Sequence, residues 1–338
     1  MFGFVSIGSR NVATLQSHSN TSVNKICREY GHSTMRYTAR NMMRCKSVLY
    51  CCGDSGDGKS VNSVADGSSR AESEALFLTQ AVPGDELVRT ISANGQVACK
   101  VVKASGLVSG SCSLFRTSPV ASAALGRALV CTLLLSTGKK DRETVNIEFR
   151  CSGPIKSIVA IANGLGEARG YVGDPKVVLP PNADGKLDVG KAVGKGILAV
   201  IRNHPFWKQP YTGLVAISSG EVAEDIAQYL ADSEQTPSAL GAGVYVNRSG
   251  LVEVAGGYLV ELLPGCEEST IELVERNIAE LGMTPTQLFQ AGFSAEEIVE
   301  KLMRDLNPMA LTTSAPRYKC TCAIDRVKRT IALIKLDE

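Results

Sequence analysis

Histidines, aromatic side chains and long apolar runs are all scarce in this sequence. The 338 residues include three histidines and one tryptophan, and aromatic residues make up 5% of the chain. His18 and His32 lie near the N-terminus. His204, beside Pro205 and Trp207, is the only other histidine, and a loop histidine is more often structural than a catalytic base. No Cys/His or Ser/His pair stands out as catalytic, so we expect a protein that is not an enzyme.

The short apolar runs argue against a membrane-spanning helix, and the charge balance argues against general nucleic-acid binding. The longest apolar run, ALVCTLLLS at 128–136, is far shorter than the roughly 20 residues of a membrane-spanning helix. Of the 36 Lys and Arg and the 34 Asp and Glu, nine and four fall in the first 70 residues, so the rest is mildly acidic. General nucleic-acid binding needs a clustered positive surface. We therefore expect a soluble protein with neither a membrane nor a nucleic-acid partner.

Acidic residues are nearly absent from the first 53 positions. Glu29 is the single acid there, beside seven basic residues and many Ser, Thr and Asn. The segment also lacks the 7–15-residue apolar stretch of a secretory signal, so its composition is that of an organellar transit peptide. Without an obvious Arg-rich amphipathic helix, it favours a plastid (chloroplast) over a mitochondrion. A disordered cytosolic tail is the other interpretation. With the Gly/Ser/Asp-rich stretch that follows, residues 1–75 are predicted to be a transit peptide and disordered bridge.

Residues 53–60, GDSGDGKS, match the phosphate-loop pattern G-x-x-x-x-G-K-[ST]. This match makes a nucleotide-binding enzyme the alternative function, with Lys59 on the phosphates and Ser60 on magnesium. Asp54 and Asp57, however, would place negative charge where the phosphates sit. The residues that follow have no apolar helical face, so the helix N-terminus that binds anions is missing. We interpret the match as a coincidence in a Gly/Ser-rich tract.

The pattern of the remaining chain predicts an α+β fold. Short strands dominate, and a hairpin is expected where Asn94-Gly95 interrupts residues 86–105. Residues 119–136 read as a buried helix with Ser118 as its N-cap and Gly138 as its stop. Residues 144–153 alternate as a half-buried strand.

After Pro264 the pattern changes to three short helices with narrow apolar stripes. The last of them opens with the capping box Ser294…Glu297. We predict an α+β core domain at 76–265 and a helical linker at 266–316, which is stable only while it is docked on a neighbour.

Two of the eleven cysteines have a spacing that suggests chemistry. The odd, scattered set in a chain without a secretory signal does not indicate a disulfide framework. Cys131 and Cys151 lie in apolar patterns and are expected to be small core residues. Cys320 and Cys322, in contrast, form a C-x-C pair, whose side chains point the same way in extended backbone. Such a pair could hold a thiophilic metal, but a structural zinc takes four ligands.

Several strings of this sequence together resemble the redox-regulated holdase chaperones of the 33-kDa heat-shock protein (33 kDa chaperonin) family. The similarity runs from about residue 85 to Cys322. It is carried by these strings: SPVASAALGRALVCTLLLSTG, CSGPIKSIVAIANGLGEARGYVGDP, VGKGILAVI, PYTGLVAISSGEVAEDIAQYLADSEQTPSALGAGVYVN, AGGYLVELLPG and RYKCTC.

This resemblance implies an α+β N-terminal domain, a helical linker and a small C-terminal zinc domain. It also implies a chaperone that works without ATP, in which oxidation of zinc-bound cysteines releases the linker and exposes apolar surface for unfolding client proteins. A homodimer is one form expected of the active state.

The family's zinc site is C-x-C followed by C-x-x-C. Cys320 and Cys322 match the first pair, as redox-switch and metal residues, and the second pair is absent from this sequence. Residues 317–338 are thus expected to be an incomplete zinc and redox-switch domain. Either full redox gating is lost, or the chain is an incomplete product of its gene. We expect zinc to bind weakly or not at all.

Overall fold

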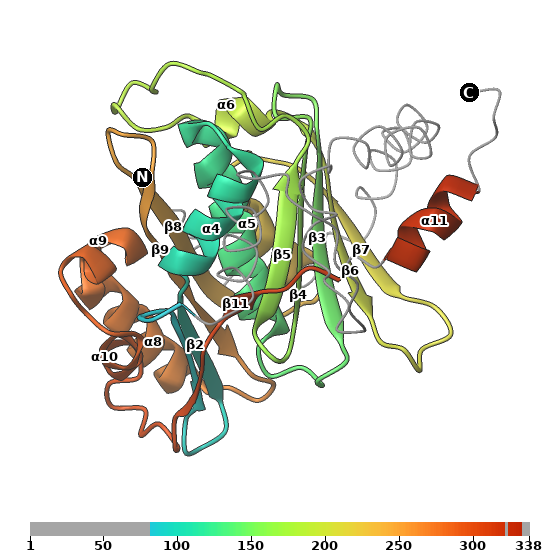
Figure 1. Cartoon of the computed structure of the whole chain (residues 1–338). Coiled ribbons are helices and arrows are strands. Elements are labelled where there is room, and N and C mark those ends of the chain that lie inside the picture. The colour runs from blue at the N-terminus through green and yellow to red at the C-terminus, as the bar shows by residue number, and fades with distance from the viewer. Residues whose placement is uncertain (1–81, 322–323, 333–338) are drawn as a thin grey trace, which may run out of the picture. The chain divides into compact units, whose positions relative to one another are not determined.

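The computed structural model describes residues 82–321 and 324–332 (Figure 1). These residues divide into two compact units. The main unit comprises residues 82–318, and the described part of the second comprises 319–321 and helix α11, Ile324–Ala332. The predicted transit peptide and bridge at 1–75, including the phosphate-loop match at 53–60, lies outside the described residues.

The first sheet of the main unit has five strands in the order β10-β1-β2-β9-β8, and every pairing in it is antiparallel. Its strands are β1 (Glu86–Ile91), β2 (Val97–Lys103), β8 (Ser238–Val246), β9 (Val252–Leu262) and β10 (Thr312–Ser314). The hairpin β1–β2 turns at Asn94-Gly95 as predicted, and Gly95 has the positive φ of 71° that such a turn requires. Four of the five strands thus come from two local hairpins, and β10 joins from a distant part of the chain.

The second sheet has six strands in the order β11-β5-β4-β3-β6-β7. Its strands are β3 (Thr144–Cys151), β4 (Ser157–Asn163), β5 (Glu167–Val172), β6 (Gly196–Asn203), β7 (Tyr211–Ala216) and β11 (Arg317–Tyr318). The predicted alternation of β3 is confirmed, because Val145, Ile147 and Phe149 are buried and their neighbours are partly exposed. β11 pairs with β5 in parallel, whereas the other pairs are antiparallel.

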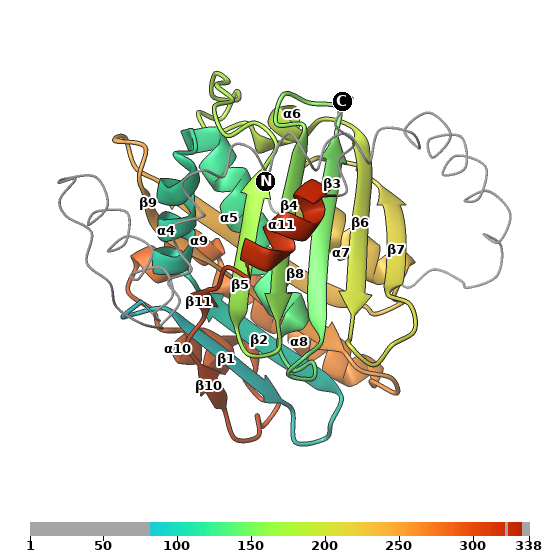
Figure 2. The same cartoon turned by 45° about the vertical axis from the view of Figure 1, so that its right-hand side comes forward.

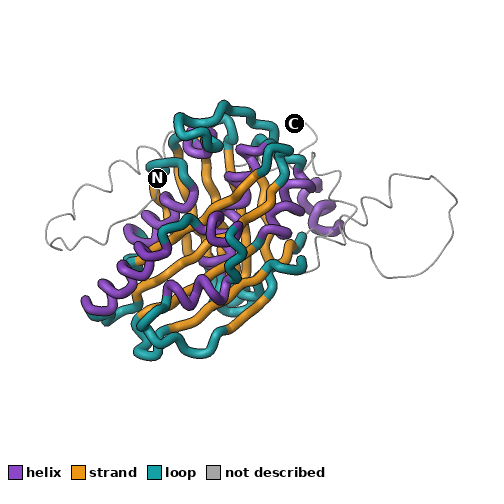
Figure 3. Tube along the Cα trace, turned by 90° about the vertical axis from the view of Figure 1, so that its left-hand side faces the viewer, coloured by secondary structure: helices purple, strands orange, loops and turns teal. Residues whose placement is uncertain are grey.

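Helix α5 (Pro119–Ser136) lies at the centre of the main unit and contacts strands of both sheets, β4 and β5 on one side and β8 and β9 on the other (Figures 1 and 3). The Ser118 side chain accepts a hydrogen bond from the Ala121 N–H, which confirms the predicted N-cap. Gly126 allows close packing, since an added Cβ would lie 2.6 Å from Val108 and 2.7 Å from Val244. By length and composition alone α5 could cross a membrane, but 89% of it is buried inside the protein, as expected of a core helix.

Helix α4 (Ser105–Phe115) has no counterpart in the sequence analysis. It is rich in Gly and Ser, which are poor helix formers, and the Ala104 side chain cannot cap it. Asp85, which is distant in sequence, supplies the cap instead: its carboxylate accepts hydrogen bonds from the N–H groups of Gly106 (2.9 Å) and Leu107 (2.8 Å). Burial raises the pKa of this carboxyl, and these two hydrogen bonds oppose that shift. Two further helices of the main unit are α6 (Val189–Val193) and the amphipathic α7 (Val222–Asp232).

The three predicted helices after Pro264 are present as α8 (Glu268–Leu281), α9 (Pro285–Gln290) and α10 (Ala295–Leu302), which we call the linker helices. Both α9 and α10 begin with capping boxes, and the one at Ser294 and Glu297 was predicted. Helix α10 contacts β1 and β2, and α9 contacts β8 and β9. The linker helices therefore share an apolar core with the five-stranded sheet, and the boundary between the domains at 265 and 266 stays a prediction.

A segment that we call the strap, residues 307–318, follows the linker helices and lies along one edge of each sheet (Figure 2). Its first part forms β10, which pairs with β1 in the register Leu87↔Ser314 to Arg89↔Thr312. Its last part forms β11 beside β5. One short segment thus supplies an outermost strand to each sheet.

Candidate functional site

The candidate site is one face of the five-stranded sheet, which we call the covered surface. Because side chains alternate along a strand, the paired residues Val88, Val101 and Tyr258 lie on the same face. The full set, all buried, is Val88, Val97, Cys99, Val101, Tyr258, Val260 and Leu262. Without the linker helices this face would be a contiguous apolar patch, which on a protein surface usually marks an interaction site.

The linker helices cover this face with their narrow apolar stripes. The side chains that reach it are Val274, Ile278, Leu288, Phe289, Ala295, Ile298, Val299 and Leu302, followed by Met303 and Leu306. Complete burial of one large apolar side chain contributes roughly 1.5–3 kcal/mol. The Phe289 ring packs closely on β9, since a Cβ added to Gly256 would lie 2.3 Å from its Cε2. Apolar packing is therefore the main force that holds the linker helices on the sheet.

Two polar side chains of the hairpin β1–β2 fix the helix starts. Glu86 Oε1 accepts a hydrogen bond of 2.6 Å from the Ala295 N–H at the first turn of α10, where a negative charge also complements the helix dipole. Gln96 Oε1 accepts hydrogen bonds from Thr270 Oγ1 (2.8 Å) and the Glu267 N–H (3.3 Å) at the start of α8. These contacts make the docking of the linker helices specific in position.

The linker helices are also tied to one another. Asn277 Nδ2 on α8 donates to the carbonyl oxygens of Leu302 (3.1 Å), the last residue of α10, and Arg304 (2.8 Å), just after it. Ion pairs of 2.7 Å join Arg304 to Glu280 and Arg276 to Asp305. All four charged side chains are roughly half exposed, so each pair contributes little to stability. The linker helices are therefore joined as a group mainly through Asn277 and shared apolar contacts.

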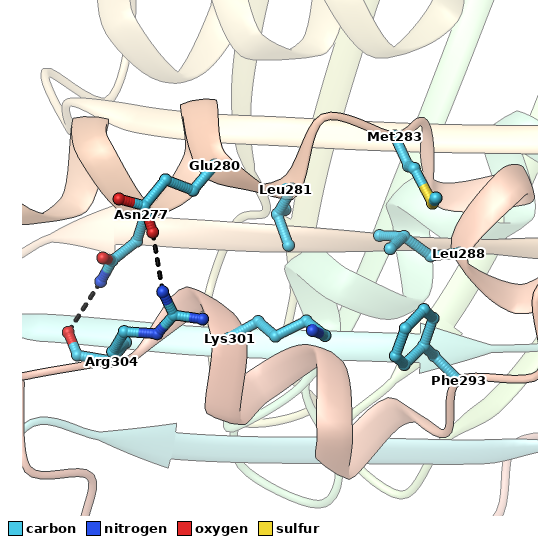
Figure 4. A pocket seen from close by; sticks show the side chains of 8 residues that line it. All are labelled: Asn277, Glu280, Leu281, Met283, Leu288, Phe293, Lys301 and Arg304. Carbon is cyan, nitrogen blue, oxygen red and sulfur yellow. Dashed lines mark hydrogen bonds and ion pairs between the residues drawn. The ribbon is translucent and has the colours of Figure 1, made fainter.

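Packing among the linker helices is incomplete (Figure 4). A cavity of about 130 Å³ is lined by Asn277, Glu280, Leu281, Met283, Leu288, Phe293, Lys301 and Arg304. Asn277 Oδ1 is buried and accepts no hydrogen bond within the described part of the chain. Lys301 Nζ lies 4.8 Å from the centre of the Phe293 ring. A cavity and an unsatisfied carbonyl both lower the stability of the packed arrangement, which agrees with a segment that can leave the sheet.

The predicted site residues are only partly described. Cys320 is half-buried and lies two positions after the end of the strap, whereas Cys322 lies outside the described residues. No group of three or more His, Cys, Asp or Glu side chains that could hold a metal occurs in 82–321 and 324–332. The pairing of Cys320 with Cys322 therefore stays a prediction.

The other candidate residues have structural roles. Cys131 is fully buried, and burial raises the pKa of its thiol to about 12. The half-buried Cys151 has a thiol pKa of about 12 too, through burial and the nearby Asp225. His204 Nδ1 accepts a hydrogen bond of 3.3 Å from the Phe206 N–H within its own loop. Both thiols therefore stay protonated at neutral pH, and the histidine ring is hydrogen-bonded within its own loop.

Glu86 and Gln96 are the functional residues that sequence reasoning missed. Each is a single polar residue in or beside an apolar strand, which indicates only an exposed position. Their partners lie 209 and 174 positions away, so no local pattern connects them.

Comparison with known proteins agrees with this arrangement. Residues 85–338 match the family model described as Hsp33 protein. The chain is 39% identical over 256 residues to the 33 kDa chaperonin of Limosilactobacillus fermentum, covering 75% of this chain and 87% of that one. It is 36% identical over 254 residues to the 33 kDa chaperonin of Desulforamulus reducens, covering 75% and 86%. The crystal structure of the 33 kDa chaperonin (heat shock protein 33 homolog) of Thermotoga maritima matches with a TM-score of 0.69 and 31% identity, over 75% of this chain and 86% of that one.

The match of this α+β chain to relatives named 33 kDa chaperonin, over about three quarters of its length, places it among the molecular chaperones. The chain belongs to the Hsp33 family. The nucleotide-binding enzyme proposed from residues 53–60 has no support among these relatives.

Proposed function

We propose that this chaperone is a holdase that needs no ATP and that binds unfolding proteins on the covered surface once the linker helices have left it. The observation that carries the proposal is the burial of a contiguous apolar sheet face under three short helices with an internal cavity. Unfolding proteins expose apolar side chains, and burial of apolar surface is the dominant favourable term in their association. In the docked state the linker helices occupy this surface, so they compete with client proteins for it.

Oxidation of Cys320 and Cys322 is the proposed trigger. Two thiols and one hydrogen peroxide give one disulfide and two waters, so the thiols lose two electrons and two protons to the oxidant. A bridge that spans a single residue is strained and distorts the backbone around it. Since Cys320 lies two positions after the end of the strap, such a change acts on the part of the chain that leads back to the linker helices.

The C-x-C pair alone provides too few ligands for tight zinc binding. A structural zinc takes four ligands, and the C-x-C pair supplies two. The described residues offer no cluster that would complete the set. We therefore propose weak or absent zinc binding, and no step of the trigger depends on the metal.

The experiment is suppression of aggregation of a thermally unfolded client by the full chain, reduced and after peroxide, without nucleotide. The proposal expects suppression that is unchanged when ATP is added. Failure to suppress aggregation under every redox condition would contradict it. An apyrase-treated sample is the matched control for carried-over nucleotide.

We also propose that residues up to a point between about 45 and 75 are removed on import into a plastid. The support is the near absence of acidic residues in the first 53 positions. Mass spectrometry of the N-terminus of the protein from tissue tests this, and recovery of intact Met1 would contradict it.

A further inference from the structure

The first part of the strap, residues 307–315, is held in place mainly by its backbone. Every residue from 309 to 315 is exposed, and this stretch includes all of β10. The Met309 N–H nevertheless donates to the Ile91 carbonyl (2.8 Å), the Ala93 N–H donates to the Asn307 carbonyl (2.9 Å), and β10 pairs with β1 over three residues. A strand that contributes hydrogen bonds and almost no side-chain burial can be replaced by any other extended backbone.

The strand beneath the strap borders the covered surface. β1 lies between β10 and β2, so it becomes an edge strand when β10 leaves. Its Val88 side chain belongs to the covered surface, while Arg89 lies on the opposite face and is exposed. An open edge strand presents unpaired N–H and C=O groups and is a ready template for another strand. Release of the strap would thus add a row of backbone donors and acceptors to the margin of the apolar surface.

The strap is connected to the linker helices at its start. Two non-glycine residues with positive φ, Asp305 (62°) and Asn307 (47°), form the turn between α10 and the strap. Thr313 Oγ1 in β10 donates to Glu296 Oε1 on α10 at 3.3 Å. Departure of α10 therefore removes a side-chain contact of β10 as well as its preceding anchor.

From this geometry we infer that the edge of β1 binds an extended segment of a client by strand addition, in the place that the strap occupies at rest. This inference rests on the proposed function and specifies how the client is bound. Backbone hydrogen bonds supply affinity that does not depend on sequence, and alternate side chains of the added strand reach the apolar face. The preferred client segment is one that alternates apolar and polar residues.

Hydrogen exchange on the unmodified full chain tests the inference without any variant. The chain is activated with peroxide and compared with and without a bound unfolded client. Exchange is measured in peptides that cover 86–92, 268–302 and 307–318. We expect the strap and the linker helices to lose protection in both samples, and β1 to be protected again only with client. If β1 exchanges freely although client is bound, strand addition is wrong and the proposed function stands. If no client is held, the proposed function itself fails.

Protection of β1 without client, rising with protein concentration, would show a second copy of the chain on this edge and would also overturn the inference.

A crosslink between the strap and β1 supplies an independent test. Arg89 and Thr312 are register partners and both are exposed, so Arg89→Cys with Thr312→Cys should form a disulfide that pins β10. The matched control is Arg150→Cys with Ser157→Cys, which joins β3 to β4 away from the strap. Under the same oxidant we expect the pinned variant to hold at least tenfold less client than the control, while residues 268–302 still lose protection. Equal holding by both variants would refute the inference, because the linker helices alone would then gate binding.

Discussion

Phe289 offers a direct measure of how tightly the linker helices are held. Its ring is 5% exposed and packs against β9, where a Cβ on Gly256 would lie 2.3 Å from it. Truncation of a buried phenylalanine costs about 3–5 kcal/mol through lost burial and the cavity that remains. Every 1.4 kcal/mol is a factor of ten in an equilibrium, so Phe289→Ala should raise the ratio of undocked to docked linker helices by at least about two orders of magnitude.

We therefore expect the reduced Phe289→Ala variant to suppress client aggregation nearly as well as the oxidised wild-type protein. The matched control is Leu198→Ala, at a fully buried residue of β6 that does not belong to the cluster formed by the covered surface and the linker helices. It should lower the urea midpoint of unfolding without raising activity in the reduced state. If both variants raise activity equally, general destabilisation explains the effect. If Phe289→Ala leaves activity unchanged, the linker helices do not gate binding.

Three further expectations concern Glu86, Lys139 and the C-x-C pair. Glu86→Ala leaves the Ala295 N–H without its acceptor and should weaken the docking of α10 by about 0.5–2 kcal/mol. Hydrogen exchange in α10 should therefore be faster in this variant, and Glu86→Gln should have a smaller effect on the exchange rate. The pKa of Lys139 is lowered from 10.5 by burial and then by Arg202 and Lys100. The unfolded chain therefore binds the Lys139 proton more tightly than the folded chain does, and the free energy of unfolding rises with pH up to about 10.5. Lys139→Met should thus be at least as stable as wild type near pH 7, with the gap narrowing at higher pH in urea titrations, and a widening gap would contradict this. Finally, the C-x-C pair supplies two of the four ligands of a structural zinc, so reduced protein should carry well under one zinc per chain, and one tightly held zinc per chain would refute the proposed weak binding.

Local signals in the sequence predicted the elements that are stabilised locally. The N-cap at Ser118 and the apolar run after it located α5, and the alternation of residues 144–151 located β3. The capping box at Ser294 located α10. In each case the residues that define the element lie within it or beside it, so the local sequence is enough to predict the element.

Elements whose stability comes from distant residues could not be predicted in this way. Helix α4 depends on Asp85, about 20 positions earlier, and its own Gly and Ser residues indicate no helix. The strand β10 has three exposed residues and no alternation, and it exists because β1 offers an edge. The same holds for the candidate site: the apolar stripes of the linker helices were predicted, but the face that they cover depends on strand order.

The central position of α5 has a consequence for the birth of the protein on the ribosome. This 18-residue helix needs β8 and β9 to cover one of its sides, and β9 ends at Leu262, 126 residues after Ser136. At a synthesis rate of about 5–20 residues per second, the ribosome needs roughly 6–25 s to produce that cover. During this interval a nascent helix that is apolar on nearly all sides is exposed to other chains and to targeting factors that select apolar segments. A protein that shields the apolar surface of others thus requires early protection of its own.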